Sequence, residues 1–169
     1  SKFKTKFACE VKSFDQELYF EKKEARKLDR YSQYGLAAVH QAMADSGIDV
    51  STVNHDKAGV IWGSGIGGLD TFLEECVGFA KGDGTPRFNP FFIPKMIADI
   101  ASGHISIKYG FRGPNFTTVS ACASSTNALM DAFMYIRLGK ADIIISGGSE
   151  AAINEAGIGG FNAMHALSV

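Results

Sequence analysis

The sequence predicts an α/β fold in which helices cover both faces of a sheet of parallel or mixed strands. Residues 141–146 are continuously apolar at their centre, as expected of a strand that is buried on both faces. Residues 57–62 predict another buried strand, and a glycine-rich turn and a helix follow it, so strands and helices alternate along the chain. The 169-residue length suits one domain with a substantial core.

The first part of the chain is predicted to form a short exposed strand and then a long helix. Residues 1–14 alternate apolar and polar side chains, and residues 15–46 are helical in pattern with Gly47 as the C-cap. Cations spaced i, i+3, i+4 and i+7 would share one helix face, which could attract an acidic partner or simply face water. These cations are Lys23, Arg26, Lys27 and Arg30.

The glycine-rich turn after residues 57–62 matches the pattern G-x-G-x-x-G at Gly63, Gly65 and Gly68. This pattern binds dinucleotide phosphates when it opens a helix, and residues 69–80 are predicted to be helical. However, Asp83 lies in a loop and not at the end of a second strand, where the ribose-binding acid is needed. We therefore expect these glycines to keep a tunnel or a neighbouring backbone clear, with dinucleotide binding as the alternative.

The later part of the chain predicts a loop over residues 81–92, a helix over 93–109 and then a strand-to-helix connection. Residues 117–119 are β-branched, the next residues are small and polar, and residues 128–136 have a helical pattern. This order places Cys122 near a helix N-terminus, where unpaired N–H groups and positive partial charge favour the reactive thiolate. Cys122 is therefore a candidate nucleophile, and the alternative is a buried cysteine that packs as a small apolar side chain.

Composition excludes several functional classes. The net charge is −1, which gives no electrostatic basis for binding nucleic acid, and no apolar run is long enough to span a membrane. The three cysteines are widely spaced and odd in number, so we expect neither a disulfide framework nor a zinc site, and a cytoplasmic location. The four histidines are scattered and form no metal-ligand pair, so no metal is expected.

Five blocks of sequence occur in an order and spacing that point to a known family: RKLD at 26–29, GSGIGG at 63–68, YGFRGP at 109–114, VSACASS at 119–125 and GIGGF at 157–161. Together they resemble the β-ketoacyl-acyl carrier protein synthases, and among these synthase II, which elongates chains in dissociated bacterial fatty acid synthesis. The resemblance extends over essentially the whole chain. It makes the nucleophile the preferred interpretation of Cys122.

The resemblance implies an acyltransferase without a bound cofactor, because its substrates are carried on the phosphopantetheine of acyl carrier protein. Cys122 would accept the acyl chain from a thioester, and its backbone N–H would be one of two oxyanion donors. A malonyl group on carrier protein would then lose CO₂, and the resulting carbanion would attack the acyl-enzyme. The product would be a β-ketoacyl chain that is two carbons longer.

The resemblance also assigns binding roles within a homodimer. The strand around residues 117–120 would pair across the dimer axis, and Phe92 would reach the acyl tunnel of the other subunit. The acidic helix of the carrier protein would dock on the cations. The resemblance therefore favours a docking surface over a helix face that only contacts water. The implied acyl-tunnel residues are Ile66, Phe92, Ala121, Gly157 and Phe161, and the implied docking residues are Lys23, Arg26, Lys27 and Arg87.

The family fold is a thiolase-like, five-layered αβαβα sandwich of two similar halves. We expect residues 1–169 to be a single incomplete domain that supplies most of the first half. The opening strand would precede Ser1, and two catalytic histidines, a lysine and the second oxyanion donor would follow Val169. These 169 residues alone are thus predicted to be inactive in condensation. The alternatives are a related polyketide-type condensing enzyme or an inactive fragment of the synthase.

Overall fold

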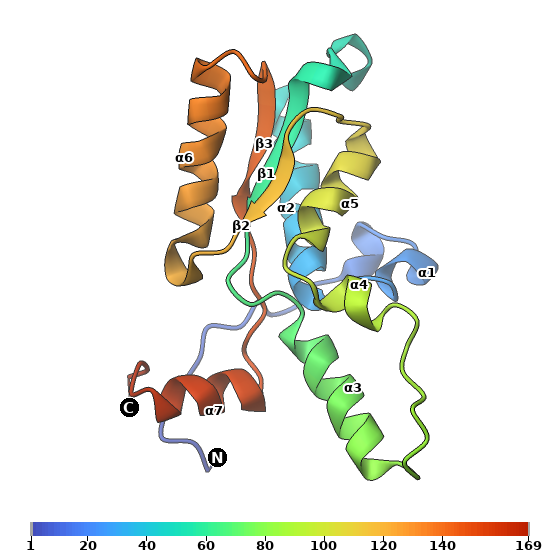
Figure 1. Ribbon diagram of the computed structural model, residues 1–169, viewed down its shortest axis with the longest axis vertical. Helices are drawn as coiled ribbons and strands as arrows, with labels where there is room; N and C mark the ends of the chain where they lie inside the picture. Colours follow the sequence, from blue (N-terminus) through green and yellow to red (C-terminus); the bar gives the residue numbers. More distant parts are fainter. Residues whose placement is uncertain (1, 169) are drawn as a thin grey trace.

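A three-stranded parallel sheet lies between two layers of helices in the computed structural model, which describes residues 2–168 (Figure 1). Strand β1 (Ala58–Gly63) is central, with β2 (Asn115–Thr118) on one side and β3 (Ile143–Gly148) on the other. Helices α2 (Arg30–Ser46) and α5 (Ile100–Tyr109) cover one face, and α6 (Ser124–Arg137) covers the other. The predicted α/β class is confirmed, and the described residues form three layers, αβα.

The alternating side chains of β1 divide the core between the two faces of the sheet. Val60 and Trp62 pack in the larger apolar cluster with α2 and α5, whereas Ile61 packs with Ala128 and Ala132 of α6. Every residue of β1 is buried. A fully buried Ile or Val side chain stabilises the fold by about 1.5–3 kcal/mol, so this strand anchors both layers.

The three strands end side by side, and the segments that follow them converge. Gly63 pairs with Thr118 on one side and with Gly148 on the other. Helices α3 (Leu69–Lys81), α4 (Phe92–Met96) and α7 (Glu155–Ala163) lie beyond these carboxyl ends, as Figure 1 shows. In open α/β sheets, ligands bind in the crevice outside the carboxyl ends of the strands.

The long helix predicted over residues 15–46 is interrupted. Turns at Gln16–Leu18 (η1) and Lys22–Ala25 (α1) precede α2, which begins only at Arg30. Asp29 breaks the helix because its backbone is extended and its buried carboxylate accepts hydrogen bonds from the N–H of Tyr31 and the N–H of Thr71. The predicted sharing of one helix face by the four cations is therefore wrong.

Two further predictions of secondary structure need correction. Residues 2–14 contain bends and a turn, with Ser13 at φ +57°, and form no strand of the described sheet. The helix predicted over 93–109 is two helices, because Ile97 is extended between α4 and α5. Short 3₁₀ turns at Val50–Thr52 (η2), His55–Lys57 (η3) and Ala121–Ala123 (η4) complete the fold. Ser1 and Val169 lie outside the described residues. They are the positions next to which we expect the opening strand and the second half of the family fold.

The face of α6 that points away from the sheet is strongly apolar. Only small residues of this helix, such as Ala128 and Ala132, are buried against the sheet. Its large apolar side chains are exposed, which is uncommon for a soluble helix and typical of a surface that is covered by another element. They are Leu129, Met130, Phe133, Met134 and Ile136, followed by Leu138 at the C-cap.

Candidate active site

Cys122 lies in η4, between the end of β2 and the start of α6, and it is exposed. The prediction of a strand-to-helix turn is thus confirmed, and the alternative of a buried structural cysteine is wrong. Ala121 has φ +51°, a left-handed conformation that costs a non-glycine residue free energy. Such strain is common at functional turns, and here it lies directly before the thiol.

Hydrogen bonds from side chains hold this turn. The buried Ser124 hydroxyl accepts from the N–H of Ser120 at 2.9 Å and donates to the carbonyl of Ala121 at 2.7 Å. The Thr118 hydroxyl donates to the carbonyl of Ser124 at 2.7 Å, and the Asn127 amide donates to the Ser120 hydroxyl at 2.6 Å. The turn therefore has one defined conformation, with Cys122 at its tip. Sequence reasoning missed Ser124, because a serine at a helix start is common.

Cys122 lines a pocket of about 360 Å³ at the carboxyl ends of the strands. Three of the predicted tunnel residues, Ile66, Ala121 and Phe161, line this pocket together with Cys122. Gly157 is buried in α7 and does not line it, and neither does Phe92. The full lining is Gly63, Ser64, Gly65, Ile66, Ala121, Cys122, Ser124, Ser125, Gly148, Ser149, Glu150, Ala152 and Phe161.

Phe92 belongs to an aromatic cluster on α3 and α4. Its ring stacks on Phe88 at 5.6 Å between centroids and lies 6.3 Å from the ring of Phe72. Phe79 packs on Phe88, and Phe72, Phe79 and Phe88 are 41–45% exposed, so this cluster forms an apolar surface on the arm built by α3, α4 and the loop between them. The cluster lies on a different segment from the lining of the Cys122 pocket.

The glycine loop after β1 is bound by a carboxylate of the same chain. Glu150, just after β3, accepts hydrogen bonds from the N–H groups of Gly65 at 2.7 Å, Ile66 at 3.1 Å and Gly67 at 3.3 Å. A pyrophosphate would need these same donors. The loop is therefore unsuited to a dinucleotide, in agreement with the position of Asp83 in a loop. Glu150 was missed, because nothing in the sequence links it to a loop more than eighty residues earlier.

The predicted docking cations are all exposed. Lys23 lies in α1, and Arg26 and Lys27 follow it before α2 begins. The Lys27 ammonium lies over the ring of Phe91, 5.5 Å from its centroid, and Arg87 pairs with Asp83 at 3.5 Å. Lys27 is therefore next to the α3–α4 arm, although the four cations share no helix face.

No histidine lines the Cys122 pocket, and no group of His, Cys, Asp or Glu within residues 2–168 could hold a metal ion. The His55 ring contacts the carbonyls of Gly110 and Val50. Burial lowers the pKa of His104, which lies in α5. Within the same residues, no helix is both long and apolar enough to cross a membrane.

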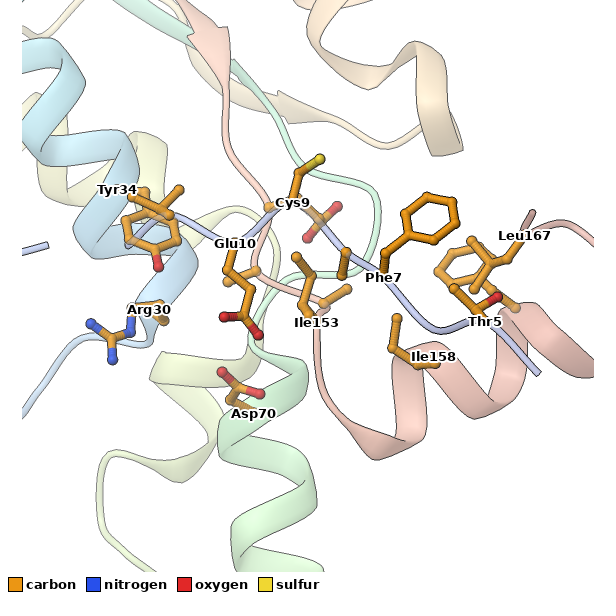
Figure 2. Close-up of a pocket in the computed structure, with 16 residues that line it drawn as sticks. Thr5, Phe7, Cys9, Glu10, Arg30, Tyr34, Asp70, Ile153, Ile158 and Leu167 are labelled. Carbon is orange, nitrogen blue, oxygen red and sulfur yellow. The ribbon is translucent and has the colours of Figure 1, made fainter. Parts of the chain in front are cut away.

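A second cavity of about 670 Å³ adjoins the first, and the two share Glu150, Ala152 and Phe161. Figure 2 shows the N-terminal segment crossing it from α2 to α7, with Cys9 on that segment and Asp70 at the start of α3. The cavity is mixed in character, since Arg30 and Glu10 line it together with Ile153.

Comparison with known proteins agrees with this arrangement. The model of the family described as beta-ketoacyl synthase, N-terminal domain, matches residues 1–169. The chain is 44% identical over 161 residues to a 3-oxoacyl-[acyl-carrier-protein] synthase 2 of Staphylococcus aureus, covering 95% of this chain and 40% of that protein. A Synechocystis protein of the same name is 42% identical over 163 residues, covering 96% of this chain and 39% of the relative.

Solved structures share the fold. A type II polyketide ketosynthase, solved with its acyl-carrier protein and a bound hexaketide, superimposes with a TM-score of 0.84 at 24% identity. That match covers 90% of this chain and 44% of the ketosynthase chain. A beta-ketoacyl synthase of Burkholderia phymatum gives a TM-score of 0.80 at 24% identity, covering 94% of this chain and 38% of that one. The fold is thus a partial thiolase-like fold, and the chain belongs to the beta-ketoacyl synthase N-terminal domain family.

Proposed function

We propose that this chain is the N-terminal part of a 3-oxoacyl-[acyl-carrier-protein] synthase of fatty acid elongation, with Cys122 as the acyl acceptor. The chain spans about 40% of the length of the curated synthases it matches, so the activity belongs to the complete protein. The observation that carries the proposal is an exposed thiol on a hydrogen-bonded turn at the mouth of a pocket. Identity of 44% to a named synthase supports the same reaction.

The chemistry begins with attack of the Cys122 thiolate on the thioester carbonyl of an acyl carrier protein. Negative charge develops on the carbonyl oxygen, and the backbone N–H of Cys122 is one donor to it, since N–H groups in the first turn of a helix have no partner within the helix. The C–S bond to the phosphopantetheine breaks, its sulfur leaves as a thiolate that takes a proton from water, and the acyl group stays on Cys122. Malonyl-carrier protein then loses CO₂, and its carbanion displaces the Cys122 thiolate.

The acyl chain would occupy the pocket beside Cys122. Ile66, Ala121 and Phe161 supply its apolar wall, and the buried Gly157 precedes Phe161 by about one turn of the same helix. In a homodimer, β2 would pair through its free edge with β2 of a second copy. The exposed aromatic surface of the α3–α4 arm would then lie against that copy and bring Phe92 to its tunnel.

The carrier protein would dock on the exposed cations beside the α3–α4 arm. Lys23, Arg26 and Lys27 offer positive charge within a few residues of one another, and Arg87 lies on the loop of the same arm. An acidic helix is the complementary surface, and charge of this kind raises the rate of encounter. This assignment does not require the cations to share a helix.

The remaining catalytic groups would come from a second, similar half of the sandwich. We assign residues 1–169 to a single incomplete domain, and the apolar face of α6 is the surface on which the second half would pack. The two histidines and the lysine implied for decarboxylation would reach Cys122 from there. By themselves, residues 1–169 would then not catalyse condensation.

Substitution of each cysteine in the complete protein tests the proposal. Cys122→Ala should abolish condensation of acyl- with malonyl-carrier protein, whereas Cys9→Ala and Cys76→Ala should each leave it within about twofold of the wild type, as neutral surface changes do. The two controls match Cys122 because all three cysteines are exposed. Full activity of Cys122→Ala would refute the proposal.

A further inference from the structure

Glu150 connects the carboxyl ends of two neighbouring strands. It is the second residue after β3, and the N–H of Ser149 donates to the carbonyl of Gly63 at 3.1 Å, which extends the pairing of β3 with β1. The side chain of Glu150 therefore begins beside the loop that leaves β1.

The Glu150 carboxylate accepts hydrogen bonds from four consecutive residues of that loop. Oε2 accepts from the N–H groups of Gly65 and Ile66, and Oε1 accepts from the N–H of Gly67 and, at 3.4 Å, from the Ser64 hydroxyl. A Cβ atom at Gly65 would lie 3.1 Å from Oε2 and 3.2 Å from the carbonyl oxygen of Ala121. The Glu150 carboxylate, the glycine loop and the turn of Cys122 therefore lie against one another.

The other end of the loop is fixed to α4. The N–H of Gly68 donates to the carbonyl of Met96 at 2.9 Å, and a Cβ at Gly67 would lie only 2.5 Å from the same oxygen. Ile66 lies between the two attachments, and its side chain lines the pocket with Cys122 while remaining 40% exposed. The position of Ile66 therefore depends on Glu150 on one side and on α4 on the other.

We infer that Glu150 is a positioning residue that fixes the Ile66 wall of the acyl pocket and thereby sets the length of acyl chain that Cys122 accepts. The inference rests on the proposed function of Cys122. Hydrogen bonds to a carboxylate are about twice as strong as neutral ones, so loss of the charge weakens the bonds from three backbone N–H groups at once, although Gly67 keeps a second bond to the Ser64 hydroxyl at 3.1 Å. A long chain needs the whole wall, whereas a short chain touches only the part next to the sulfur.

Hydrogen exchange in the complete protein tests the anchoring separately from the chemistry. Glu150→Gln keeps the shape of the side chain, removes its charge and replaces one of the two accepting oxygens by an N–H₂ group that cannot accept. The amides of residues 65–67 should then exchange about tenfold faster. Glu155→Gln is the matched control, because Glu155 is also exposed but lines neither cavity, and it should leave these amides unchanged.

Acylation of Cys122 by butanoyl- and tetradecanoyl-carrier protein tests the selectivity. The ratio of the long-chain to the short-chain rate should fall about tenfold in Glu150→Gln and stay at the wild-type value in Glu155→Gln. Glu150→Asp, which keeps the charge, should recover part of the ratio, and it replaces Glu150→Gln if that variant fails to fold.

Two results would overturn the inference: unchanged exchange at residues 65–67, or faster exchange with an unchanged ratio of rates. A general loss of stability would slow both acylations equally and would also leave the ratio unchanged. If the wild type takes up neither acyl chain on Cys122, the proposed function fails as well, whereas exchange still reports on the anchoring by itself.

Discussion

A Cβ atom placed on Gly63 would lie 2.5 Å from the backbone carbonyl carbon of Ser124 and 2.5 Å from the nitrogen of Ser125. Gly63 ends the central strand, and Ser124 begins α6 directly after the turn of Cys122. Only a glycine lets the strand and the helix N-terminus approach so closely. The contact therefore fixes how close the N-terminus of α6, and the Cys122 turn before it, lies to the carboxyl end of β1.

Gly63→Ala should therefore destabilise the protein by at least about 2 kcal/mol, because both contacting groups are backbone and cannot turn aside. Gly103→Ala is the control: a Cβ there has no heavy atom within 4 Å, and α5 should gain about 0.5–1 kcal/mol from the better helix former. Denaturant titration of the two variants measures both effects. Equal stabilities would contradict the proposed approach of α6 to β1.

Ser124→Ala removes the hydroxyl that bridges the N–H of Ser120 and the carbonyl of Ala121. Because these groups lose their partner beside a buried side chain, we expect the free energy of unfolding to fall by about 1–3 kcal/mol and the rate of alkylation of Cys122 by iodoacetamide to change. Thr126→Ala changes an exposed hydroxyl in the same helix turn; it should not lower the free energy of unfolding and should leave the alkylation rate unchanged. An alkylation rate that is equal in the two variants would show that the Ser124 hydroxyl does not hold the turn of Cys122 in position.

Acid should destabilise the fold through His104. Burial lowers its pKa below the ordinary 6.5, with Glu24 opposing the effect, so the unfolded chain binds a proton that the folded chain does not. The free energy of unfolding should therefore decrease as the pH falls below 6.5, until the folded-state pKa is passed. Denaturant titrations between about pH 7.5 and about pH 5.5 measure the slope. His104→Gln should reduce the slope, and an unchanged slope would assign it to other groups.

Charge reversal should weaken docking of the carrier protein. Arg26→Glu combined with Lys27→Glu should raise KM for acyl-carrier protein about tenfold or more at low salt, because like charges then face its acidic helix. The difference from the wild type should shrink as salt screens both surfaces. Lys140→Glu, an exposed cation just after the C-cap of α6, is the control and should leave KM unchanged. Equal KM values in all variants would place the docking surface elsewhere.

Local patterns predicted the parts of the fold and the site that depend on neighbouring residues. The apolar run before Gly147 is a strand of the sheet, and the change from β-branched to small to helical residues places Cys122 on its turn. The helix boundary at Asp29 was not predictable, because its carboxylate binds Thr71 on a distant helix. Ile97 likewise appears helical in sequence but is extended between two helices.

The glycine loop is a second case in which a contact between residues far apart in the sequence could not be predicted. Its sequence fits a phosphate-binding turn, and only the fold brings Glu150 to the N–H groups that a phosphate would use. The residues around Cys122 come from the segments that follow three strands and from α7, so their grouping follows from the order of the strands in the sheet and not from sequence spacing. Residues 2–14 alternate like a strand but find no pairing edge among the described residues, since alternation alone supplies no partner.

Mapping the acyl group on the complete protein tests the central claim most directly. The protein is incubated with acyl-carrier protein in the absence of malonyl-carrier protein, digested, and analysed by mass spectrometry. We predict that the added mass of one acyl group is found on the peptide that contains Cys122 and is absent from the peptides of Cys9 and Cys76. An acyl group on either of those cysteines, or on none, would contradict the assignment of Cys122 as the acyl acceptor.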